Sequence, residues 1–186
     1  NIDWDGNILW DYQISDEAYQ HHHDIEPLPN GNILVIVWEK KTSAEAFEMG
    51  RQVIDNALNQ MWSTAILELD YQSGNIVWEW HLWDHLIQDI SNEYPNFGVI
   101  SEHPELFNIN EGNVGSGTTS NGDWFHINAI DYNEELNQIV FSSKLHDEIF
   151  IIDHSTTSEE ASGHTGGNCG LGGDFLYRWG NPQNYA

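Results

Sequence analysis

The sequence predicts an all-β protein built from repeated units of four antiparallel strands. Three observations support this prediction. A Gly-Asn turn followed by a Trp-rich strand occurs twice, a strand that begins at a histidine occurs twice, and the segments between them follow the same order. Strands separated by turn signals are typical of all-β domains, and similar segments in a fixed order indicate a repeat architecture.

The turn before a Trp-rich strand is the first repeated feature. The stretches DWDGNILWDY (3–12) and DYQSGNIVWEW (70–80) both contain Asp, a short turn, Gly-Asn, and then a run of aliphatic and aromatic residues. Gly and Asn favour the turn, and β-branched and aromatic residues favour the strand. A weaker third copy, GGDFLYRWG (172–180), follows EIFIIDHSTT (148–157) with an insertion in the turn.

The histidine-bearing strand is the second repeated feature. It occurs as HHHDIEPLPNGNILVIVW (21–38) and as DWFHINAIDYNEELNQIVFSS (123–143). In both, a histidine is followed at the same distance by a turn and then by an apolar strand. His23 and His126 therefore occupy equivalent positions of the two units, although about 100 residues separate them along the chain.

Four-stranded units in tandem are typical of the blades of a β-propeller. The pattern assigns residues 1–12 to the end of one blade, 21–80 to a second blade and 124–180 to a third. Known propellers close with at least four blades, whereas this chain holds roughly two blades plus part of a third. We therefore expect residues 1–186 to be a partial propeller domain, a fragment of a larger one. The alternative is a small open β-sheet protein with a duplicated motif.

Two insertions lengthen the predicted units. Residues 43–61 have apolar residues at helical spacing, with Ser43 as the expected N-cap, and predict a helix. Residues 81–123 predict a helical start near 82–90 and then a long irregular loop with a Gly, Ser and Thr-rich end. Loops of this length in compact folds usually line a site.

Composition and charge exclude several classes of function. The formal net charge of −25, from 30 acidic and 5 basic residues, repels phosphate backbones, so we expect no nucleic-acid partner. No run of 18 apolar residues is present, so we expect no membrane span. The chain shows no start Met and no signal-peptide pattern. Its single cysteine, Cys169, cannot form an internal disulfide.

Four ordered blocks of the sequence resemble the bacterial aryl-sulfate sulfotransferases over nearly the whole chain. They are HHHDIEPLPNGNIL, GNIVWEWHLWDHLIQD, DWFHINAIDYNEELNQI and EIFIIDHSTTSEEASGHTGGNCGLGGDFLYRWGNP. The resemblance implies a six-bladed propeller that transfers a sulfuryl group from a phenolic sulfate ester to a phenol, without a nucleotide sulfate donor or other cofactor. It implies channel-facing histidines, one of them transiently sulfated, and a periplasmic or secreted location. Formation of a homo-oligomer is left open.

The resemblance also assigns site residues. His23 matches the histidine of the HD-x4-PNGN block and His126 that of the D-W-x-H-x-N block, so both are catalytic candidates. Lys144, in SSKL, stands where the family has an arginine. Lysine retains the charge but loses the planar, bidentate grip on an oxyanion. His22 and Asn128 complete the substrate-binding candidates, although Asn128 is better suited to fixing a strand end by a hydrogen bond than to contacting substrate.

The nucleophilic histidine is expected in the next repeat, beyond Ala186, so the fragment alone is expected to be inactive. Two rival functions stay open. One is a non-catalytic propeller that binds a ligand or partner, and the other is a sulfatase that releases sulfate to water. His81 and His85 have the i, i+4 spacing of two ligands on one helical face. No third ligand is in register, and we expect no metal there.

Overall fold

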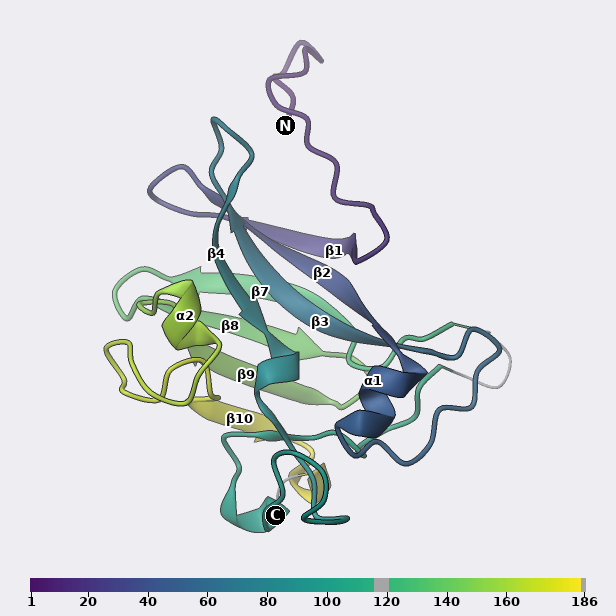
Figure 1. Cartoon of the computed structure of the whole chain (residues 1–186). Helices are drawn as coiled ribbons and strands as arrows, with labels where there is room; N and C mark the ends of the chain where they lie inside the picture. The colour runs from purple at the N-terminus through teal and green to yellow at the C-terminus, as the bar shows by residue number, and fades with distance from the viewer. Residues whose placement is uncertain (116–120, 185–186) are drawn as a thin grey trace.

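The computed structural model of the chain describes residues 1–115 and 121–184. In this part of the chain, two four-stranded antiparallel sheets lie against each other, and helical structure is restricted to short segments (Figure 1). The all-β class predicted from the sequence is confirmed. Within the described residues, no helix is long and apolar enough to cross a membrane.

The first sheet has the strand order β1-β2-β3-β4. Its strands are β1 (Tyr19–Pro27), β2 (Ile33–Thr42), β3 (Gln60–Leu69) and β4 (Ile76–His81). Along β2, Leu34 and Ile36 point to one apolar cluster, whereas Val35 and Val37 point to a second cluster on the opposite face. Both faces of the strand are therefore buried, which explains its continuous apolar run.

The second sheet has the order β10-β9-β8-β7 and is again a meander. Its strands are β7 (Ile127–Asn133), β8 (Gln138–Ser143), β9 (Glu148–Asp153) and β10 (Tyr177–Gly180). Arg178 of β10 is buried and donates hydrogen bonds from Nε and Nη2 to the Glu148 carboxylate, at 2.8 and 3.0 Å. This buried ion pair gives Arg178 a structural role at the edge of the sheet.

A single apolar core joins the two sheets. The ring of Trp80 in β4 lies 5.4 Å from the ring of Phe141 in β8. The inner edge strands, β1 and β7, lie side by side as a result. The core residues of the sheets include Leu34, Ile36, Ile66, Trp78, Trp80, Ile127, Ile130, Ile139, Phe141, Phe150 and Ile152.

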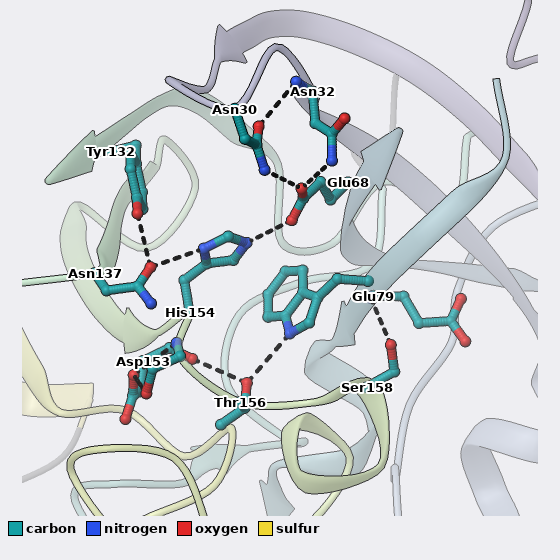
Figure 2. Close-up of polar contacts among 12 residues, drawn as sticks. Asn30, Asn32, Glu68, Glu79, Tyr132, Asn137, Asp153, His154, Thr156 and Ser158 are labelled. Carbon is teal, nitrogen blue, oxygen red and sulfur yellow. Dashed lines mark hydrogen bonds and ion pairs between the residues drawn. The ribbon is translucent and has the colours of Figure 1, made fainter. Parts of the chain in front are cut away.

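A polar network also crosses between the sheets (Figure 2). Glu68 of β3 pairs with His154, which follows β9, at 2.8 Å. Asn30 and Asn32, in the turn between β1 and β2, donate to the same carboxylate. Burial raises the pKa of Glu68, but the hydrogen bonds from His154 and the two asparagines outweigh it and hold the pKa below its usual value.

The predicted helix over residues 43–61 is wrong for most of its length. Helix α1 covers only Ser43–Glu48, and its N-cap is Thr42, which forms a capping box with Glu45. The chain then turns through Gly50, whose φ is +91°. The buried Arg51 side chain donates to carbonyl oxygens of the 109–112 segment. This tertiary contact holds the chain after residue 50 in an irregular loop that lasts until β3 begins at Gln60.

The predicted helical start near 82–90 is also wrong. The structure has a 3₁₀ turn, η1 (Leu82–Asp84), followed by β5 (Leu86–Ile87), which pairs in parallel with β6 (Phe107–Asn108). The consecutive residues His85, Leu86, Ile87 and Gln88 are all buried, so this part of the segment lacks the solvent face of an amphipathic helix. Most of the Gly, Ser and Thr-rich end of this insertion, residues 116–120, lies outside the described residues.

Residues 1–12, expected to end a blade, contain no strand. An isolated bridge joins Ile2 and Ile8. Trp10 and Ile14 pack on the second apolar cluster, on the outer face of the first sheet. A strand requires a neighbouring strand to satisfy its backbone groups, and the segment pairs with none in the described part of the chain.

His146 is buried in the core among the rings of Phe107, Trp124 and Phe125. Its Nδ1 lies 2.9 Å from the Ser143 hydroxyl. Burial lowers the pKa of His146 to about 4. The native state therefore keeps this imidazole neutral at pH values where an unfolded histidine is protonated.

We predict that His146 destabilises the fold as the pH falls. Between pH 6.5, where an unfolded histidine titrates, and about 4, the unfolded state binds the extra proton. From pH 7 to 5 the wild type should therefore lose about 2 kcal/mol more unfolding free energy than His146→Gln, measured by urea denaturation. The exposed-histidine control His103→Gln should lose as much as the wild type. Equal losses in wild type and His146→Gln would contradict this assignment.

Candidate active site

The backbone is irregular at the two equivalent histidines. His23 and His126 both have left-handed φ values, of 58° and 52°. The register of β1 shifts between His21 and Ile25, and that of β7 shifts just after its first residue, Ile127. Such irregularities turn a side chain out of the regular strand direction. The two units thus share an unusual local conformation as well as a sequence pattern.

These two histidines meet where β1 lies beside β7. The Nε2 atoms of His23 and His126 are 3.3 Å apart, and their rings are nearly perpendicular. The neighbouring His22 places its Nδ1 2.9 Å from Nδ1 of His23. Residues about 100 positions apart in the sequence therefore form one histidine cluster, as their equivalent positions led us to expect.

An aspartate that sequence analysis missed orients the cluster. Asp123 Oδ2 lies 2.5 Å from Nδ1 of His126, and Asp123 Oδ1 accepts a hydrogen bond from Trp38 Nε1 at 3.1 Å. The Trp38 ring stacks on His22, with centroids 3.9 Å apart. The i, i+3 spacing of Asp123 and His126 was the available signal, but it identifies a pair only when the backbone turns between them.

One neutral tautomer for each histidine satisfies these contacts. Because the Asp123 carboxylate is an acceptor, Nδ1 of His126 carries the proton and its Nε2 is free to accept. His23 then donates from Nε2 to His126 and accepts at Nδ1 from His22. The Nε2 of His22 is left as a buried lone pair with no hydrogen-bond partner among the described residues.

His22 lies behind His23. Its burial, followed by the charges of His23 and His126, lowers the pKa of His22 to about 3. The imidazole of His22 is therefore neutral over the physiological range. Its position between Trp38 and His23 favours a role in holding His23 in place over direct contact with a substrate.

Lys144 follows β8 and Asn128 lies on β7, so both are near His126 in the chain fold. The Lys144 amide donates to the His126 carbonyl at 3.1 Å, and its side chain is exposed. Asn128, also exposed, accepts a hydrogen bond from the Ser142 hydroxyl at 3.2 Å, which links β7 to β8. Asp24 accepts from the backbone of Ile130 at 3.2 Å and so ties β1 to β7.

An aromatic hollow of about 330 Å³ adjoins the cluster. Tyr19, Trp38 and Trp62 contribute to its walls, together with the polar side chains of Lys40 and Gln60. Trp38 is shared, because it also contacts His22 and Asp123. The lining also includes the acidic residues Asp16 and Glu17. A flat aromatic molecule could stack on the aromatic walls of this hollow.

The two histidines with i, i+4 spacing do not share a helical face. His81 ends β4 and pairs with Glu39 at 3.2 Å, whereas His85 is fully buried and pairs with Asp174. An i, i+4 pair shares a face only on an α-helix, and the structure has a 3₁₀ turn there.

We predict that Asp123→Asn changes the tautomer of His126. The two carboxylate oxygens of Asp123 serve Trp38 and His126 separately. Asparagine has one side-chain oxygen, so the Nδ1–H form of His126 loses its charged acceptor. Two-bond ¹H–¹⁵N spectra should show the proton on Nδ1 in the wild type and a population with the proton on Nε2 in the variant. Asp24→Asn, which removes a carboxylate bonded to a backbone amide, should leave the His126 signals unchanged. Retention of the pure Nδ1–H form in Asp123→Asn would rule out the orienting role.

A comparison with models of protein families identifies the family of this chain. A family model described as arylsulfotransferase (ASST) matches residues 1–159, a range that contains the histidine cluster and Asp123. No curated protein and no solved structure matches the chain. Because the family model covers well over half of its residues, the chain belongs to the arylsulfotransferase family.

Proposed function

We propose that this protein is an aryl-sulfate sulfotransferase, which transfers a sulfuryl group from a phenolic sulfate ester to a phenol acceptor without a nucleotide donor. The observation on which the proposal rests is the meeting of His23 and His126, from equivalent strands, with Nε2 atoms 3.3 Å apart. Membership of the family supports the reaction class, and the orienting contact of Asp123 supports a chemical role for His126.

Sulfuryl transfer, by analogy with phosphoryl transfer, spreads negative charge over three equatorial oxygens while a phenolate leaves. In the proposed site the Nε2–H of His23 turns from His126 to one of these oxygens. His126 donates to another once its Nε2 is protonated, and Asp123 stabilises the imidazolium that results. Lys144 adds a positive charge beside His126. In a chain of net charge −25, an anion requires such a local source of positive charge.

The transfer proceeds in two halves through a sulfohistidine. In the first, the bond from sulfur to the donor phenol oxygen breaks, a sulfur–nitrogen bond forms, and the phenolate takes a proton from the histidine pair. In the second, the acceptor phenol gives its proton to the pair and its oxygen displaces nitrogen from sulfur. We place the nucleophilic histidine in the next repeat, beyond Ala186, as the resemblance implies.

The same proposal treats each four-stranded sheet as one blade of a larger propeller, six-bladed in the complete protein. In that arrangement β1 and β7 are the innermost strands, and the histidine cluster faces the central channel. The aromatic hollow beside Trp38 would accommodate the phenol ring. We further propose a periplasmic or secreted location, the one typical of the family.

We predict that the protein, extended to include the following repeat, turns over 4-nitrophenyl sulfate continuously only when phenol is added, and that without phenol it releases at most about one equivalent of nitrophenolate per enzyme. His126→Ala should lower kcat at least 100-fold, because it removes both a donor to the transferring group and a proton carrier. His103→Ala, a change at an exposed histidine outside the cluster, should retain full activity. The chain of residues 1–186 alone should not turn over.

Other outcomes of this assay would assign a different function. Continuous release of many equivalents that does not depend on phenol would identify a sulfatase. No release from several aryl sulfates, with the protein folded, would contradict the enzyme proposal and favour a propeller that only binds a ligand or partner.

We also predict that binding of the sulfate ester takes up about one proton. In the free cluster His126 Nε2 is an acceptor, and it must gain a proton to donate to the anion. Calorimetric titrations at pH 7.5 in buffers of different ionisation enthalpy should yield an uptake near one for residues 1–186. Asp123→Asn should reduce both the uptake and the affinity. Binding with no proton exchange in the wild type would show that the cluster already carries the proton.

A further inference from the structure

A second histidine cluster lies away from the candidate active site. His85, in the segment between η1 and β5, places Nδ1 2.7 Å from Oδ1 of Asp174. His164, in the glycine-rich loop after α2 (Ser158–Ala161), places Nδ1 2.8 Å from the same oxygen. The three ligand atoms all lie within 4.8 Å of one another. Nothing in the proposed sulfuryl transfer uses these residues.

The orientation of His85 leaves a lone pair for a cation. Its Nε2 lies 2.8 Å from the carbonyl oxygen of Ala161, an acceptor, so Nε2 carries the proton of the neutral ring. Nδ1 of the neutral ring then faces a carboxylate oxygen at 2.7 Å, and two acceptors at this distance repel unless a cation or proton lies between them. A backbone carbonyl on the other nitrogen is the usual outer contact of a metal-binding histidine.

The surroundings hold His85 rigidly. The side chain is fully buried and stacks parallel to Trp80, whose Nε1 donates to the carbonyl oxygen of Gly173 at 2.7 Å. A Cβ at position 173 would lie 2.7 Å from Nε2 of His85 and would collide with the Ala161 carbonyl, so this position needs a glycine. Asp174 is likewise only 4% exposed. Two of the three groups are therefore preorganised.

We infer that His85, His164 and Asp174 bind a divalent transition-metal ion, for which Zn²⁺ is the probe. Two imidazole nitrogens and one carboxylate oxygen suit zinc and its neighbours better than Mg²⁺ or Ca²⁺. His164 is 54% exposed at its side chain, so it can rotate to widen its contact, and water can complete the coordination. The ion would link the loop that ends at Asp174, which follows β9 of the second sheet, to the segment after β4 of the first sheet.

Zinc titration of the metal-stripped full chain tests this inference. Calorimetry should show saturable binding at this site, and His164→Ala and Asp174→Asn should each weaken it at least tenfold. His103→Ala is a matched control, because His103 is also an exposed histidine 2.8 Å from a carboxylate, that of Glu105, but forms no three-residue cluster in the described part of the chain. Because the active-site histidines could also take zinc, His126→Ala is titrated in parallel and should retain this site.

Thermal unfolding provides a second readout. Zinc at about 100 times its Kd should raise Tm by roughly 5 °C or more in the wild type and in His103→Ala. At the same zinc concentration the rise in Tm should be at most about half as large in His164→Ala, because its Kd is at least ten times higher. Absence of saturable binding in the wild type, or equal affinity in His164→Ala, would overturn the inference. The cluster would then be a structural ion pair between the histidines and Asp174.

Discussion

The arrangement of this protein depends on the burial of two sheet faces against each other. Trp80 from the first sheet and Phe141 from the second lie within one continuous core, and each is almost completely buried. Burial of one such side chain contributes about 1.5–3 kcal/mol. The buried contact of Glu68 with His154 adds a directional link across the same interface (Figure 2). The ring of Trp78 lies edge-on to the same histidine, with centroids 4.7 Å apart. The sheets can therefore meet in only one register.

That register creates the candidate active site. The inner strands lie side by side because the sheets behind them are packed, and His23 and His126 then face each other. Left-handed backbone costs about 1–2 kcal/mol at each non-glycine residue. Such strain persists only where surrounding packing over-determines the conformation. Here the packing energy of the core offsets this cost. The left-handed backbone at His23 and His126 turns both imidazoles into the space between the strands.

Histidine, more than lysine or arginine, pairs with the carboxylates of this protein. With 5 basic residues against 30 acidic ones, most buried or half-buried carboxylates must find another partner. Among the described residues, six histidines pair with carboxylates; they are His81, His85, His103, His126, His154 and His164. Their surroundings distinguish them. His154 lies within the sheet interface, His126 reaches a histidine on the neighbouring sheet, and His85 reaches a carboxylate shared with a second histidine.

The sequence by itself determined the all-β class, the duplicated unit and the equivalence of His23 and His126, because turn residues and strand patterns act over a few neighbours. It did not determine where helix α1 ends, since the buried contacts of Arg51 with a segment about 60 residues away decide the path of the chain. It also did not reveal the role of Asp123, or the meeting of His85 with Asp174. The first depends on a turn of the backbone between Asp123 and His126, and the second joins segments 89 residues apart, which only tertiary packing brings within hydrogen-bonding distance.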